Sequence, residues 1–101
     1  MKVTKKNTTS GSSLILEGEL TIYTVSVTHA KLLESYDDAI DPVAIDASNI
    51  SEIDTAGVQL LLFTKKMFAD NNKRLYLEKS NPQVDNVLNT LDVAAHFALS
   101  N

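Results

Sequence analysis

The sequence predicts an α/β domain with a four- to five-stranded mixed sheet and helices packed mainly on one face. Short apolar runs of strand length alternate with longer segments in which apolar residues recur at helical spacing. Strands that alternate with helices form parallel pairs, and two strands joined directly by a turn near the start of the chain add an antiparallel pair. A length of 101 residues allows a single core, so we expect one domain over residues 1–101.

The first two strands are predicted at residues 2–8, which alternate weakly and fit a sheet edge, and at residues 14–16. The Ser-Gly-Ser-Ser cluster at residues 10–13 forms the turn between them, and Gly18 breaks or bulges the end of the second strand. Residues 43–45 form an apolar run without alternation, which is typical of a strand covered on both faces.

Beyond this strand, the chain is expected to turn at Ser48 and Asn49. Residues 50–53 then lead to the next helix, and residues 75–77 form the last apolar run of strand length.

Helix boundaries follow from capping and stop signals. Asp41-Pro42 ends the first helix, Asp54 begins the second, and Asn81-Pro82 begins the third. The predicted helices cover residues 24–39, 55–69, 82–90 and 93–99.

The composition is that of a globular domain, with 44% hydrophobic and 22% charged residues. A net charge of -4 and scattered basic residues argue against nucleic acid or an anionic membrane as a partner. The N-terminus lacks the apolar run of a signal peptide, and no apolar run approaches the roughly 20 residues that span a bilayer. We therefore expect a cytoplasmic protein without direct membrane insertion.

No cofactor, metal site or catalytic residue is predicted. The chain has no cysteine, and His29 and His96 lack the spacing of metal ligands. The polar stretch at residues 5–13 lacks the spacing of a phosphate-binding loop, and no nucleophile stands beside a base. The chain is therefore expected not to be an enzyme.

The stretch from Asp54 to Gly57 carries the functional prediction. Asp54 is the candidate N-cap of the second helix, its side chain accepting a hydrogen bond from the amide of Gly57 or its neighbour. Thr55 then occupies the first helical position, where free N–H groups and the positive end of the helix dipole stabilise a phosphate. Its hydroxyl is well placed for modification and poorly placed to be a nucleophile. Taken alone, the same residues are equally consistent with a helix cap that has no regulatory role.

A Leu-Leu-Leu-Phe run at residues 60–63 follows in the same helix. Four consecutive residues span the circumference of a helix, so one or two should be exposed and mark an interface. The alternative is that the whole run is core, covered by a neighbouring helix. The expected partner-binding residues are Asp54, Thr55, Ala56, Gly57, Gln59 and Leu60.

Three segments together resemble the STAS domain, the fold of the anti-sigma-factor antagonists. They are GEL at 18–20, IDASNISEIDTAG at 45–57 and SNPQVDNVLNTL at 80–91, in the order and spacing of that family. The resemblance implies a STAS-like fold, and it is strongest to stand-alone bacterial STAS proteins of signalling systems. Thr21 departs from the acidic residue, and Ala56 from the second serine, that many members carry.

The resemblance implies a partner-switching role. An unphosphorylated STAS protein binds a partner, such as a GHKL-type serine/threonine kinase that doubles as an anti-sigma factor. Phosphorylation of the hydroxyl residue after the aspartate releases the partner, and a PP2C-type phosphatase resets the switch. By position, Thr55 matches the phosphorylated residue and Asp54 the aspartate.

Two other functions stay open. One is a constitutive STAS subunit of a membrane-lipid ABC transporter complex, in which Thr55 carries no phosphate. The other, which the sequence favours less, is a small nucleotide-binding protein or enzyme.

Overall fold

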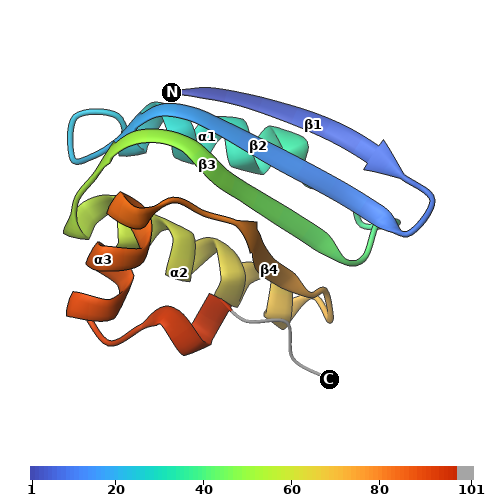
Figure 1. Ribbon diagram of the computed structural model, residues 1–101. Helices are drawn as coiled ribbons and strands as arrows, with labels where there is room; N and C mark the ends of the chain where they lie inside the picture. Colours follow the sequence, from blue (N-terminus) through green and yellow to red (C-terminus); the bar gives the residue numbers. More distant parts are fainter. Residues whose placement is uncertain (98–101) are drawn as a thin grey trace.

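The computed structural model, which describes residues 1–97, has one mixed four-stranded sheet and three α-helices within that range (Figure 1). The fold class predicted from the sequence is confirmed, with four strands. The elements are β1 (Lys2–Thr8), β2 (Gly11–Leu20), α1 (Val25–Ser35), β3 (Val43–Ile53), α2 (Thr55–Asp70), β4 (Leu75–Lys79), α3 (Pro82–Thr90) and the 3₁₀ turn η1 (Ala94–Phe97).

The strands lie in the order β1-β2-β3-β4. β1 and β2 form an antiparallel hairpin, whereas β2–β3 and β3–β4 are parallel pairs joined through α1 and α2. The carboxyl ends of β2 and β3 therefore lie at the same end of the sheet, and both α1 and α2 begin there.

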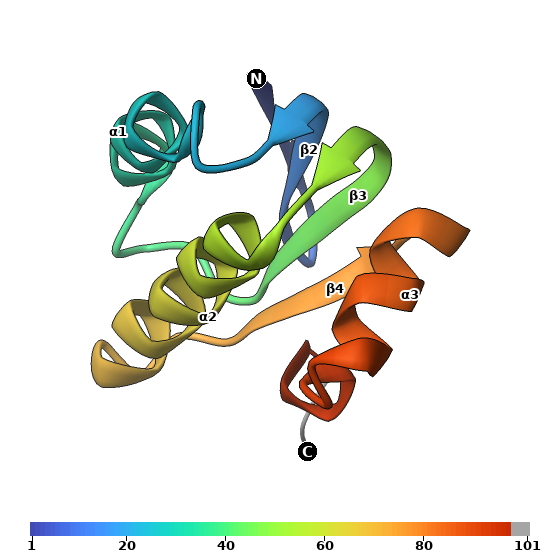
Figure 2. The same cartoon turned by 90° about the vertical axis from the view of Figure 1, so that its left-hand side faces the viewer.

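The helices cover one face of the sheet. Along β2, Ser12, Leu14 and Leu16 are buried, whereas Ser13 and Ile15 between them are partly exposed. Successive strand residues point to opposite faces, so the buried set marks the covered face. Figure 2 shows α1 and α2 side by side along one side of the sheet.

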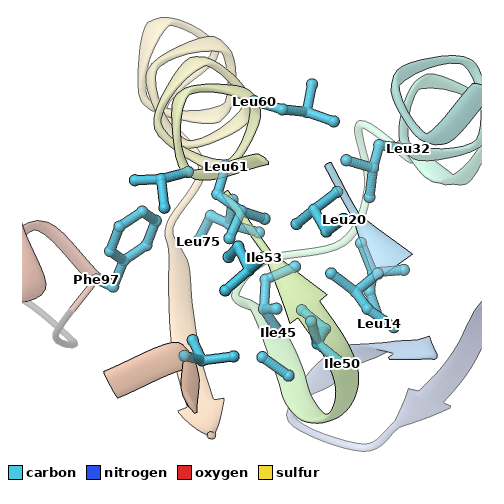
Figure 3. Packing of buried hydrophobic residues seen from close by; sticks show 14 of the residues in the cluster. Leu14, Leu20, Leu32, Ile45, Ile50, Ile53, Leu60, Leu61, Leu75 and Phe97 are labelled. Carbon is cyan, nitrogen blue, oxygen red and sulfur yellow. The ribbon is translucent and has the colours of Figure 1, made fainter. Parts of the chain in front are cut away.

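The hydrophobic core fills the space between this face and the helices. Figure 3 shows Leu20 of β2, Ile53 of β3 and Leu61 of α2 close together, with Leu32 of α1 beyond them. Leu20 has no exposed surface and Leu61 has 2%. The ends of β2 and β3 are thus packed against the first half of α2.

The prediction of a turn at Ser48 and Asn49 is wrong, because β3 runs without interruption from Val43 to Ile53. The register against β2 shifts at this point, so that β3 carries an extra residue. Asp46 Oδ1 accepts hydrogen bonds from the Ser48 hydroxyl at 2.6 Å and from its amide at 3.0 Å. Polar residues that favour turns here stabilise a bulge inside a strand instead.

The first helix is shorter than predicted. It ends at Ser35, because Tyr36 has an extended conformation (φ -66°, ψ 131°). At the end of the chain, the helix predicted at 93–99 is a 3₁₀ turn over Ala94–Phe97, and residues 98 and 99 lie outside the described range. The predicted N-cap of α3 is confirmed, because the Asn81 side chain accepts from the Val84 amide at 2.9 Å.

Among residues 1–97, no helix combines the length and the apolar character that crossing a membrane requires.

Candidate functional site

The turn between β3 and α2 has the predicted capping geometry. Asp54 has an extended backbone, and its Oδ1 accepts a hydrogen bond from the Gly57 amide at 3.0 Å. The carbonyl of Asp54 accepts from the Val58 amide at 3.0 Å, which is the first bond of the helix. Asp54 is therefore the N-cap of α2, and Thr55 is its first residue.

The second carboxylate oxygen of Asp54 contacts a distant segment. Oδ2 accepts from the amide of Ile22, at 2.9 Å, in the loop between β2 and α1. The Ile22 amide is the strongest influence that lowers the pKa of Asp54, followed by the Gly57 amide. Hydrogen bonds to the charged form favour it, so Asp54 is ionised at neutral pH. Asp54 thus joins the start of α2 to the loop before α1.

Gly57 brings α2 into close contact with the end of β2. It is buried, and a Cβ at this position would overlap the carbonyl oxygen of Leu20 and lie 2.9 Å from Leu20 Cγ. The amide of Asp54 also donates to that carbonyl oxygen, at 3.3 Å. A residue without a side chain is needed here because another backbone approaches closely.

The other predicted partner-binding residues lie on this turn and the helix that follows. Thr55 and Gln59 are exposed, Ala56 is half-buried, and Leu60 is 8% exposed. In the run at 60–63, Leu60 and Leu61 are core residues, whereas Phe63 is 54% exposed. The expectation that one or two of these residues face solvent is met by Phe63.

An apolar groove of about 440 Å³ separates α1 from α2 at the end where both helices begin. Residues that line it include Ile22, His29, Ala56, Gln59, Leu60 and Phe63.

Two of the groove residues are strongly exposed, Ile22 at 61% and Phe63 at 54%, and the neighbouring Tyr23 is exposed at 90%. The ring of His29 packs edge-on against that of Phe63, with centroids 5.4 Å apart. Exposed apolar side chains gathered beside a groove are typical of protein-binding surfaces.

The α1 side of this surface was not predicted from the sequence. Ile22 and Tyr23 form an apolar pair directly before a helix cap, which is a weak signal for an exposed loop. Their proximity to Asp54 depends on the tertiary fold. Within residues 1–97, no three residues of the metal-binding types lie close enough to hold a metal ion.

The comparison with family models identifies the chain. A model described as "Mlab, STAS domain" matches residues 3–99, and the chain therefore belongs to the STAS domain family. A search of curated proteins found no significant match.

Several solved structures share the fold. An anti-sigma factor antagonist from Mycobacterium paratuberculosis superposes with a TM-score of 0.83 at 14% identity, over 97% of this chain and 83% of its own. The anti-sigma factor antagonist SpoIIAA in its unphosphorylated form gives a TM-score of 0.72 at 19% identity, over 99% of this chain and 89% of its own.

The phosphorylated form of SpoIIAA, a Bacillus cell fate determinant, gives a TM-score of 0.68 at 19% identity, over 99% and 92% of the two chains. At these identities the similarity establishes the fold that the sequence predicted.

Proposed function

We propose that this protein is a non-enzymatic signalling regulator of the partner-switching type. Its unphosphorylated form binds a GHKL-type serine/threonine kinase or anti-sigma factor, and phosphorylation at Thr55 releases that partner. A PP2C-type phosphatase restores the binding form. The observation that carries this proposal is the position of Thr55, which is exposed at the first turn of α2 beside an apolar groove.

The chemistry of the switch needs no catalytic group from this chain. The kinase transfers the γ-phosphoryl group of ATP to the Thr55 hydroxyl oxygen, ADP leaves, and the kinase accepts the hydroxyl proton. Hydrolysis by the phosphatase returns the hydroxyl and releases inorganic phosphate. Thr55 needs only to be accessible, and its exposed position at a helix end provides this.

A phosphate on Thr55 acts mainly on binding. It adds about -1.5 to -2 charges at pH 7. At the start of α2 the helix dipole offsets part of this charge, so the fold should persist. At an interface that covers Ala56 and the groove, the same charge would be desolvated without a partner, and such a penalty opposes binding by about 2–5 kcal/mol.

Titration of the purified partner against wild type, Thr55→Glu and Thr55→Ala tests the proposal, after capture from a lysate of the native cells identifies that partner. We expect the kinase or anti-sigma factor to bind wild type and Thr55→Ala but not Thr55→Glu. Incubation with ATP should label wild type and leave Thr55→Ala unlabelled. Equal binding by Thr55→Glu would contradict the switch.

Phe63→Ser tests the docking surface separately from the phosphate. Phe63 is half exposed and lines the groove, so this change should weaken binding of the same partner while the thermal midpoint stays close to that of wild type. Gln59→Ala removes a polar side chain at another groove position on α2. Comparing the partner affinities of the two variants shows whether the apolar contact of Phe63 contributes more to binding than the polar contact of Gln59.

One observation favours a second function. The matching family model carries the description "Mlab", which fits a constitutive STAS subunit of a membrane-lipid ABC transporter complex. In that case an ATPase subunit should bind wild type and Thr55→Glu equally, and Thr55 should carry no phosphate in cells. The same capture experiment separates the two functions by the identity of the bound protein.

A further inference from the structure

We propose that phosphorylation of Thr55 acts through Asp54 and releases the loop between β2 and α1. Two amides donate to the Asp54 carboxylate, Gly57 N–H to Oδ1 and Ile22 N–H to Oδ2, and we call this pair of hydrogen bonds the Asp54 bridge. In this inference, which rests on the proposed phosphorylation, the modified protein loses one wall of its own groove as well as gaining charge.

The Asp54 bridge holds the exposed part of the loop against α2. The loop's other hydrogen bonds are local: the Tyr23 amide donates to the Thr21 hydroxyl at 3.3 Å, and the Thr24 amide to the Thr21 carbonyl at 2.9 Å. The amide of Ile22 instead donates across to Asp54. The position of Ile22 relative to the groove therefore depends on the Asp54 carboxylate.

A phosphate at Thr55 competes with that carboxylate. Thr55 and Asp54 are adjacent, with Cα atoms about 3.8 Å apart. A phosphate at the first helical position is attracted to the same N–H groups at the start of α2 that Asp54 now caps, and it repels the carboxylate. The phosphate can replace Asp54 as the acceptor for the Gly57 amide, so α2 keeps its cap.

The Ile22 amide has no such replacement. It belongs to the preceding loop, and Ile22 is 61% exposed, so water takes the place of the lost acceptor. Ile22 then leaves its position at the edge of the groove, and Tyr23 moves with it because the two are consecutive. The partner loses apolar contacts on the α1 side of the surface, at a distance from the added charge.

The exchange rate of the Ile22 amide proton, measured by NMR on the purified protein, tests this inference. The proteins compared are wild type, wild type carrying phosphothreonine at position 55 introduced by synthesis, and Asp54→Asn. The asparagine keeps one oxygen for the Gly57 amide, but its NH₂ group cannot accept from Ile22. Thr55→Ala is the control that leaves Asp54 unchanged.

We expect Ile22 to exchange about tenfold faster, or more, in both the phosphorylated protein and Asp54→Asn, the effect of losing a hydrogen bond to a charged acceptor. The Gly57 amide should stay protected in both. Unchanged exchange of Ile22 in the phosphorylated protein would overturn the inference, and so would unchanged exchange in Asp54→Asn.

This readout needs no partner, so it separates the inference from the proposed function. Faster exchange at Ile22 with undiminished partner binding would support the coupling through Asp54 and contradict partner switching. Loss of partner binding with unchanged exchange at Ile22 would support partner switching and contradict the coupling through Asp54.

Discussion

Replacing Gly57 with alanine should destabilise the protein by forcing α2 away from the end of β2. The added methyl group would overlap the Leu20 carbonyl oxygen and approach Leu20 Cγ to 2.9 Å and the carbonyl carbon to 3.0 Å. The Leu20 side chain, which has no exposed surface, is packed in the core and cannot turn aside. The overlap with its carbonyl involves backbone, so relief requires movement of β2 or α2.

The expected loss combines two opposing effects. Overpacking of a buried site costs about 1–3 kcal/mol, and contact with backbone places this site at the upper end. Alanine has a higher helix propensity than glycine by about 1 kcal/mol, which offsets part of the loss. The net destabilisation should be about 2 kcal/mol, and the midpoint of thermal unfolding should fall by about 8–16 °C.

Urea and thermal unfolding followed by far-UV circular dichroism measure this change. Gln59→Ala is the matched control: it introduces alanine two residues further along α2 at an exposed position, and should change stability by no more than about 0.5 kcal/mol. Equal stability of wild type and Gly57→Ala would refute the reasoning, because it would mean that α2 and β2 can separate without cost.

Two further predictions concern stability. The pKa of Asp54 is lowered in the folded protein, so its contribution is present above the unfolded pKa of about 4 and is lost as the pH falls below that value. The urea concentration at the midpoint of unfolding should therefore decrease when the pH is lowered below about 4. This decrease should be smaller in Asp54→Asn, which has no carboxylate at this position.

Asn81→Asp should destabilise the protein by about 1–3 kcal/mol in urea titrations. The Asn81 NH₂ group donates to carbonyl oxygens of β3, including that of Ile50 at 2.9 Å, and a carboxylate would be repelled by them while still capping α3. An unchanged midpoint at pH 7 would show that these bonds contribute nothing.

Signals between residues close in the chain predicted the caps of α2 and α3 correctly. Asp54 and Gly57 are three residues apart, as are Asn81 and Val84, so the cap and its amide are both visible in a short stretch of sequence. The helix periodicity and the apolar runs likewise predicted each strand and helix, though not every boundary.

Contacts between distant segments were not predictable in this way. The bond between Asp54 and Ile22 joins residues 32 positions apart, and the groove exists only because α1 and α2 begin at the same end of the sheet. At Ser48, the hydrogen bond typical of a turn forms inside β3, because pairing with β2 on both sides of this residue, at Asp46 and Asn49, holds the strand extended. Strand pairing therefore overrode the local preference of these residues for a turn.

The sheet order β1-β2-β3-β4 is also the order of the strands in the chain. Each strand pairs with the strand that precedes it in the chain, so each pairing closes only the loop between those two strands. The entropic cost of loop closure is therefore small at each step. During synthesis the sheet can grow strand by strand behind the first hairpin. Both hydrogen bonds of the Asp54 bridge lie within the first 57 residues, so neither β4 nor α3 contributes a group to them.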